Sequence, residues 1–175
     1  MNKIRFAKVK ENAVIPSKRE EDAGYDIYAC FDEDYIIIQP HETKLIPTGI
    51  ASAFSDDYVM VLKERGSTGT KGMAQRSGII DSGFRNEWLV PITNANYKPI
   101  IITDILSYTK ITVVDEECGI RYFSNDNSII YPKSKAIAQA LLLPVPKVEI
   151  EEITYDELIE IKSERGNGML GSSGK

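Results

Sequence analysis

Short runs of β-branched and aromatic residues recur along this chain, and polar turn segments separate them. Such side chains favour extended strands, because they pack well on a pleated surface. The runs lie at residues 35–38, 44–46, 58–62, 88–92, 100–102, 111–114, 138–143 and 148–153. The turn segments, which contain proline, glycine, asparagine or aspartate, lie at 39–42, 47–49, 55–57, 94–96 and 144–146. This spacing predicts an all-β, jelly-roll-like barrel or sandwich.

One short surface helix is predicted near the C-terminal end. Thr154 and Glu157 have the spacing of a capping box, and Leu158 and Ile161 follow as an apolar pair. Residues 103–130 alternate strand-like pieces with polar turns. We expect this segment to form a surface β-hairpin on 111–114 and 120–123, outside the active site and open to a protein partner.

The length of 175 residues is enough for one domain with a core. We expect a β domain at 1–164 and a flexible, glycine-rich flap at 165–175. A glycine-rich segment beside Arg165 suits closure over phosphates, because backbone N–H groups can approach a ligand closely there. A disordered terminus is the alternative interpretation.

The charge and cysteine content restrict the partners and the compartment. A net charge of −5 argues against nucleic-acid binding, which normally needs a basic excess. No apolar run approaches the ~20 residues that span a bilayer, so no membrane partner is expected. Two cysteines without metal-ligand spacing suggest a reducing, cytoplasmic environment. An acidic protein that handles an anionic substrate would need a few focused cations and a divalent metal.

Several polar residues could carry chemistry, and each also has a structural interpretation. Asp81 follows an apolar pair and precedes a Ser-Gly turn, so it is either a general base at a strand end or an ordinary turn aspartate. Arg65 and Arg165 each precede glycine, which suits phosphate binding or a solvated surface. Gln139 lies in an apolar strand and needs a hydrogen-bond partner, from the protein or from a ligand. Asp26 could hold a water of a metal shell or cap a turn.

Five segments resemble, in order, the five motifs of the trimeric dUTPase family, and the resemblance covers nearly the whole chain. They are Ala-Gly-Tyr-Asp-Ile-Tyr at 23–28, Arg-Gly-Ser-Thr-Gly at 65–69, Gly-Ile-Ile-Asp-Ser-Gly-Phe at 78–84, Ala-Ile-Ala-Gln at 136–139, and Arg-Gly-Asn-Gly-Met-Leu-Gly-Ser-Ser-Gly at 165–174. The resemblance implies a jelly-roll homotrimer whose sites are shared between subunits. It implies hydrolysis of dUTP to dUMP and pyrophosphate with Mg²⁺.

The resemblance also implies a role for particular residues. Asp81 would activate the water that attacks the α-phosphorus, and Asp26 and Gln139 would hold the metal through water. The implied substrate contacts are Arg65, Gly66, Ser67 and Gln139 at the phosphates, Gly78 and Ile80 at uracil, Phe84 at the deoxyribose, and Arg165, Leu170, Gly171, Ser172 and Ser173 in the closing tail.

Two other functions are considered. The related dCTP deaminases need a glutamate ten residues after the aspartate that matches Asp81, but Pro91 stands there and cannot transfer a proton. A binding or regulatory protein with weak catalysis is the other alternative. It is suggested by Gly66, where the family usually has a serine, and by Leu170, where the family has an aromatic residue.

Overall fold

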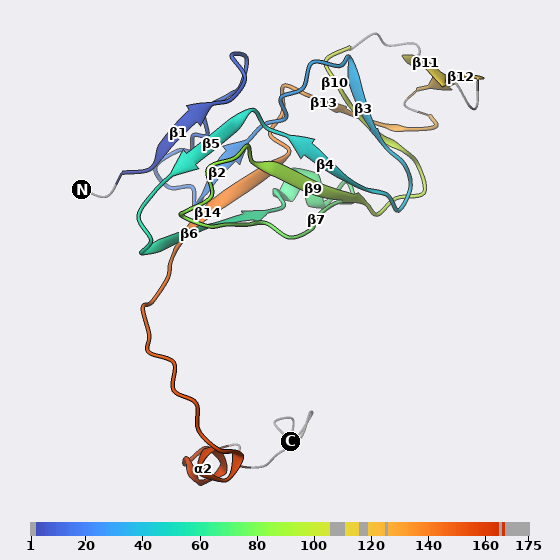
Figure 1. Ribbon diagram of the computed structural model, residues 1–175. Coiled ribbons are helices and arrows are strands. Elements are labelled where there is room, and N and C mark those ends of the chain that lie inside the picture. The colour runs from blue at the N-terminus through green and yellow to red at the C-terminus, as the bar shows by residue number, and fades with distance from the viewer. Residues whose placement is uncertain (1–2, 106–110, 116–118, 125, 165, 167–175) are drawn as a thin grey trace. The chain divides into compact units, whose positions relative to one another are not determined.

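The computed structural model describes residues 3–105, 111–115, 119–124, 126–164 and 166 (Figure 1). The strands are β1 (Arg5–Lys8), β2 (Gly24–Ile27), β3 (Tyr35–Ile38), β4 (Thr43–Pro47), β5 (Ile50–Ala53), β6 (Tyr58–Lys63), β7 (Met73–Gln75), β8 (Ile79–Ile80), β9 (Leu89–Asn94), β10 (Ile100–Thr103), β11 (Ile111–Asp115), β12 (Gly119–Phe123), β13 (Ile129–Pro132) and β14 (Ala138–Pro144). The helices are α1 (Gly66–Gly69) and α2 (Tyr155–Glu160). The predicted all-β fold class is therefore confirmed.

The strands pair across long sequence distances. The sheet orders are β2-β14-β6-β8, β4-β9-β7, β13-β10-β3 and β1-β5, and β11 and β12 form a separate antiparallel hairpin. All of these pairs are antiparallel except β10 with β13. In the described ranges the strands form these separate sheets and no closed barrel. The predicted hairpin within 103–130 is confirmed, because β11 and β12 pair.

The main apolar core of the described residues is formed by the alternation of side chains along the strands, and a small second cluster surrounds Ile101. On β9 the side chains of Val90 and Ile92 are buried, whereas Leu89 is exposed. Trp88 is fully buried, and its ring meets Phe6 edge to face at 5.6 Å between centroids. The period-two pattern therefore identifies both a strand and the face that it buries.

Helix α1 was not predicted from the sequence. Its four residues, Gly-Ser-Thr-Gly, have poor helix propensity. The turn is held by local hydrogen bonds, since the backbone N–H of Arg65 donates to Thr68 Oγ1 at 2.9 Å and Thr68 N donates back to Arg65 O at 3.0 Å. The expectation of a single helix is therefore wrong for the described residues.

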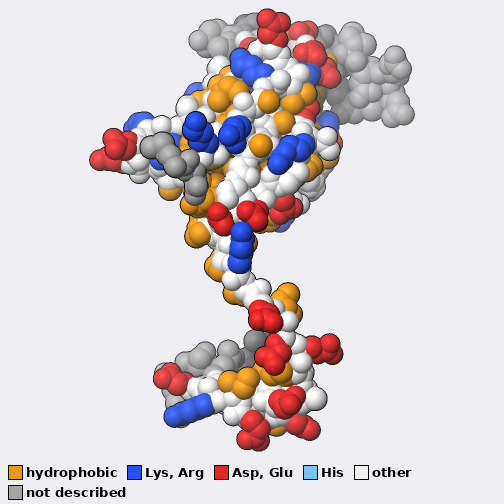
Figure 2. Space-filling model, turned by 60° about the vertical axis from the view of Figure 1, so that its left-hand side comes forward, with side chains coloured by type: hydrophobic (Ala, Val, Ile, Leu, Met, Phe, Trp, Pro, Cys, Tyr) orange, Lys and Arg blue, Asp and Glu red, His pale blue; other side chains and the backbone are white. Residues whose placement is uncertain are grey.

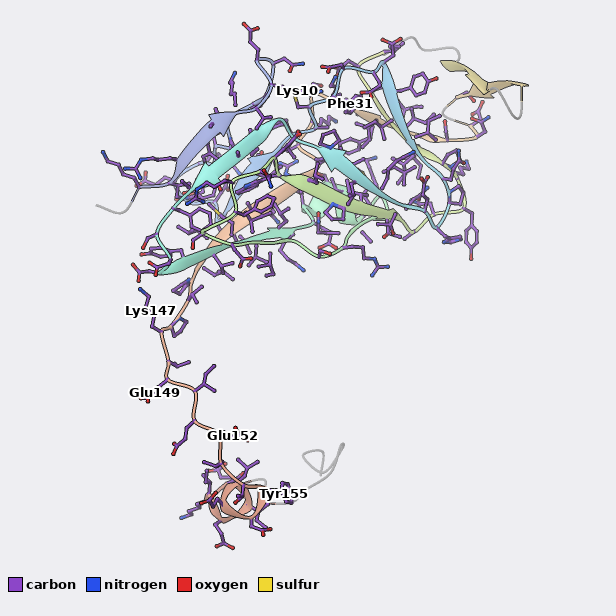
Figure 3. All side chains as sticks on the ribbon, viewed as in Figure 1. Lys10, Phe31, Lys147, Glu149, Glu152 and Tyr155 are labelled. Carbon is purple, nitrogen blue, oxygen red and sulfur yellow. The ribbon has the colours of Figure 1, made fainter. Side chains whose placement is uncertain are left out.

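The chain divides into two compact units, Met1–Val145 and Pro146–Lys175. In the second unit, the capping box of α2 is confirmed: Glu157 N donates to Thr154 Oγ1 at 3.2 Å, and Thr154 N donates to the Glu157 carboxylate at 2.8 Å. The side chains of Lys147, Glu149 and Glu152 project from an extended segment before it (Figure 3), and acidic side chains gather on this unit (Figure 2).

The strand predicted at 148–153 is wrong, because the segment forms no strand. The side chain of Ile150 in this segment is 93% exposed. The predicted boundary between the β domain at 1–164 and the flap at 165–175 stays a prediction, because Arg165 and residues 167–175 lie outside the described residues. Neither described helix has the length and apolar character of a membrane span.

Candidate functional site

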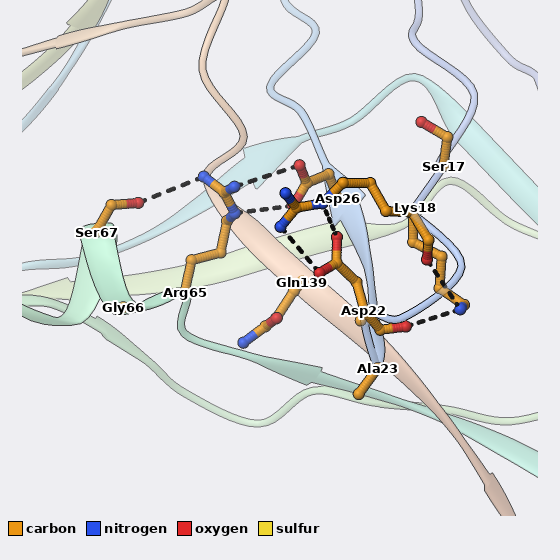
Figure 4. Close-up of a pocket in the computed structure, with 11 residues that line it drawn as sticks. Ser17, Lys18, Asp22, Ala23, Asp26, Arg65, Gly66, Ser67 and Gln139 are labelled. Carbon is orange, nitrogen blue, oxygen red and sulfur yellow. Dashed lines mark hydrogen bonds and ion pairs between the residues drawn. The ribbon is translucent and has the colours of Figure 1, made fainter.

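A polar pocket of about 690 Å³ opens where β2, β14 and the turn after β6 meet (Figure 4). It is lined by Ser17, Lys18, Arg19, Asp22, Ala23, Gly24, Asp26, Arg65, Gly66, Ser67 and Gln139. Strand pairing produces this meeting, because Gln139 on β14 lies opposite both Asp26 on β2 and Lys63 on β6. Three segments far apart in the sequence thereby bring five predicted site residues together.

Arg65 is the central cation of the pocket. Its Nε forms an ion pair with Asp26 Oδ1 at 2.8 Å, and a terminal nitrogen donates to Asp26 Oδ2 at 3.3 Å. The other terminal nitrogen donates to Ser67 Oγ at 3.3 Å. Both the Arg65 and Asp26 side chains are about a third exposed, so an anionic ligand can reach the guanidinium.

The Gln139 amide is satisfied within the protein, as its place in an apolar strand requires. Its Nε2 donates to Glu64 O at 2.7 Å. The amide oxygen packs against Gly24, where an added Cβ would lie only 2.6 Å from Gln139 Oε1. The glycine of the first motif therefore allows β2 and the Gln139 side chain to approach closely.

Glu64 connects this part of the site to β7. Its carboxylate accepts a hydrogen bond from Gln75 N at 2.8 Å. Hydrogen bonds from its own backbone N–H, and then from that of Gln75, lower the pKa of Glu64. The charged carboxylate therefore favours the folded state.

Glu64→Gln is expected to lower the melting temperature at pH 7. Because the pKa of Glu64 is lower in the folded state, its contribution is complete above the ordinary value of 4.5 and is lost as the pH falls through the folded-state pKa. The difference in melting temperature between wild type and variant should therefore shrink below pH 4.5. Thermal denaturation at several pH values tests this, and a difference that stays constant into acid would contradict it.

The predicted base and sugar contacts lie on β8 and in the residues that flank it, Gly78 and the turn at 81–84. Gly78 has a φ of +117°, and its carbonyl accepts from Leu62 N at 2.7 Å. An added Cβ would lie 2.8 Å from Leu62 O, so only glycine fits. Asp81 directly follows the strand and is exposed, and its carbonyl accepts from Phe84 N at 3.0 Å in a turn. The predicted position of Asp81 at a strand end is therefore confirmed.

The predicted phosphate contacts, in the polar pocket, and the predicted base, sugar and catalytic residues, around β8, lie at different places on one chain. Strand β8 pairs antiparallel with Met60 and Val61 of β6. The chain therefore runs from β8 toward the beginning of β6 at Asp81, whereas Arg65 follows the end of β6. Gly78, Ile80, Asp81 and Phe84 do not line the polar pocket. Arg165, Leu170, Gly171, Ser172 and Ser173 lie outside the described residues.

Sequence reasoning missed the loop that forms the pocket's outer wall. Arg19 pairs with Asp22 at 2.8 Å, and Lys18 Nζ donates to Asp22 O at 2.7 Å. The two adjacent cations just before the first motif were the available signal, but either could equally have been a solvated surface charge.

The dUTPase family model matches residues 10–112. The deoxyuridine 5'-triphosphate nucleotidohydrolase of Leptospira interrogans is 32% identical over 104 residues, covering 57% of this chain and 71% of that protein. The protein of the same name from Nautilia profundicola is 29% identical over 177 residues, with 99% of each chain covered. Among solved structures, a tyrosine-to-phenylalanine mutant of the Staphylococcus bacteriophage 80alpha dUTPase with dUpNHpp matches at a TM-score of 0.73, with 25% identity and complete coverage of both chains.

Proposed function

Because this chain belongs to the dUTPase family and is a dUTP diphosphatase, we propose that the polar pocket and the β8 segment, residues 78–84, are the two parts of its active site. The observation that carries the proposal is Arg65, held against Asp26 beside Gln139 in a polar pocket. Arg65, Gly66, Ser67 and Gln139 would contact the triphosphate. The backbone at Gly78 and Ile80 would contact uracil, and Phe84 would pack on the deoxyribose.

In the proposed reaction, Asp81 accepts a proton from a water molecule as that water attacks the α-phosphorus. The bond between the α-phosphorus and the α,β-bridging oxygen breaks, and pyrophosphate leaves with the bonding electrons. Arg65 offsets the negative charge that develops on the phosphate oxygens, which is the effect of a preorganised cation in a partly enclosed site. Arg165, Ser172 and Ser173 would close over the outer phosphates.

Mg²⁺ fits the donors of the polar pocket. Mg²⁺ usually keeps several waters and is held by one or two carboxylates together with substrate phosphates. In the described part of the chain, no three His, Cys, Asp or Glu side chains gather as metal ligands, but Asp26 supplies one carboxylate and Gln139 one amide in the pocket. These two residues would hold the ion through water. When bound, Mg²⁺ supplies positive charge to the triphosphate.

The function is tested by pyrophosphate release from dUTP, UTP and the four standard deoxynucleoside triphosphates, with Mg²⁺ and with EDTA. We expect hydrolysis of dUTP in preference to the others and its loss in EDTA. Slow turnover with tight dUTP binding would support the binding-protein alternative instead.

The cellular compartment is a separate proposal. Fractionation of the source cells should find the protein in the cytoplasm.

Gly66→Ser is expected to lower the KM for dUTP. No heavy atom lies within 4 Å of a Cβ placed at Gly66, so a serine fits and its hydroxyl could bind phosphate. One added hydrogen bond of ~0.5–1.5 kcal/mol corresponds to a KM lower by about twofold to tenfold. Gly69→Ser, which makes the same change at the other end of α1, is the control and should leave KM unchanged. An unchanged or higher KM in Gly66→Ser would remove residue 66 from the phosphate site.

We propose that the two parts of the site meet between subunits of a homotrimer. Light scattering should give close to three times the chain mass of 19.6 kDa. Asp81→Asn and Arg65→Ala proteins, each nearly inactive, should regain activity when they are unfolded and refolded together. Random assembly would leave about a quarter of the sites with both native residues. An active monomer, or no regain in a mixed trimer, would contradict the shared site.

A further inference from the structure

We propose that Arg19 is a further substrate-binding residue, which holds the β- and γ-phosphates of dUTP from the outer wall of the polar pocket. The inference rests on the proposed role of this pocket as the phosphate site. Arg19 lines the pocket but lies outside the five motif segments, just before the first of them.

The loop that carries Arg19 is held by contacts that do not use the Arg19 side chain. Lys18 Nζ donates to three backbone carbonyls of the loop, those of Arg19, Glu20 and Asp22, at 3.3, 3.3 and 2.7 Å. These bonds use all the N–H donors of Lys18, so this residue frames the loop and has none left for a ligand. Asp22 N also donates to Arg19 O at 3.2 Å. The loop therefore keeps its frame when the Arg19 side chain is changed.

Arg19 itself has a fixed direction and keeps donors for a ligand. Its Nε donates to Asp22 Oδ2 at 2.8 Å and its Nη2 donates to Asp22 Oδ1 at 3.0 Å, so one edge of the guanidinium is occupied. The N–H groups of Nη1, on the other edge, have no acceptor in the described part of the chain. The side chain is 87% exposed, so an anion can reach that edge.

Arg65 is held in the same manner (Figure 4). Its Nε and Nη2 also contact the two oxygens of one aspartate, Asp26, at 2.8 and 3.3 Å. The pocket therefore contains two guanidinium groups, each fixed at its Nε edge by a carboxylate from the same stretch of chain, 22–26. Guanidinium groups fixed in this way present paired donors, which match the oxygens of a phosphate group.

The charges of the pocket favour an anion. Among the described residues that line it, the cations Lys18, Arg19 and Arg65 outnumber the carboxylates Asp22 and Asp26. The whole chain has a net charge of −5, so this local excess of positive charge is a property of the pocket and not of the surface in general. Two fixed guanidinium groups in one pocket suit a ligand with more than one phosphate group.

The connectivity of dUTP decides which phosphates Arg19 binds. In the proposed site, the deoxyribose packs on Phe84, and the α-phosphorus is attacked by the water that Asp81 activates. Both residues belong to the β8 segment, which does not line the polar pocket. The β- and γ-phosphates extend away from the nucleoside and therefore enter the pocket. Arg19 then contacts the pyrophosphate part of the substrate and not the dUMP part.

The test is Arg19→Ala, with ligand binding measured by calorimetry and turnover measured separately. We expect the Kd of a non-hydrolysable dUTP analogue and the KM for dUTP to rise about threefold to tenfold, a modest factor because the side chain is exposed. The Kd of dUMP, which lacks the pyrophosphate part, should change by less than about twofold. The melting temperature should change little, because the loop is framed by Lys18 and by backbone hydrogen bonds.

Lys10→Ala is the matched control. Lys10 is also a cation paired with one carboxylate, that of Asp32 at 2.7 Å, and it does not line the polar pocket. The variant changes the net charge by the same amount and should leave the analogue Kd, the dUMP Kd and the KM unchanged.

Three results would overturn the inference: an unchanged analogue Kd in Arg19→Ala, an equal loss of dUMP affinity in that variant, or an equal rise of the analogue Kd in Lys10→Ala. Arg65→Ala separates this inference from the proposed function. If Arg65→Ala weakens analogue binding and Arg19→Ala does not, only the role of Arg19 is wrong. If Arg65→Ala also leaves analogue binding unchanged, the polar pocket is not the phosphate site.

Discussion

Asp81→Asn is expected to lower kcat by ~10²–10⁴ while dUTP binding and the fold are retained, which is the usual effect of losing a positioned general base. The side chain is exposed at the end of β8, and the turn there is closed by the Asp81 backbone carbonyl rather than by the carboxylate. An amide of the same shape therefore disturbs little structure. Initial rates and the binding of a non-hydrolysable dUTP analogue measure the two quantities.

Asp32→Asn is the control for this prediction. It removes an exposed carboxylate whose partner is Lys10 at 2.7 Å, outside both parts of the proposed site. Its turnover should match wild type. Near-normal turnover of the Asp81→Asn protein would mean that another group is the general base.

Removing residues 165–175 is expected to reduce turnover by at least ~10²-fold, because charge-assisted hydrogen bonds of ~1.5–3 kcal/mol each would be lost from Arg165 and its neighbours. The melting temperature should change little, since the segment carries almost no core-forming residues. These contacts would form only when the flap closes, so the loss should appear in kcat as well as in KM.

Two further variants sharpen the tail prediction. Removing only Gly174 and Lys175 keeps the proposed contacts and should keep activity. Leu170→Phe adds aromatic stacking of ~0.5–1.5 kcal/mol if residue 170 lies over uracil, so KM should fall by about twofold to tenfold. Full activity without the tail would exclude it from the mechanism, and an unchanged KM in Leu170→Phe would mean that residue 170 lies elsewhere.

Local patterns predicted local structure well. The capping box at Thr154 and Glu157 depends on only four consecutive residues, and the structure confirms it. Helix α1 was missed because its glycines oppose helix formation, and its stability comes from the particular bonds between Arg65 and Thr68. The segment 148–153 has strand periodicity, but a strand also needs a hydrogen-bonding neighbour, which the sequence pattern does not show.

The sequence by itself determined the all-β class, the buried face of strands such as β9, and the residue types able to bind a triphosphate. These properties depend on side-chain period and chemistry, which are local. Only the tertiary structure decided that β14 places Gln139 between Asp26 and β6, and that β8 carries Asp81 away from Arg65. The hydrophobic pattern of a strand constrains its register, but it does not show which distant strand is its partner, and these contacts depend on that pairing.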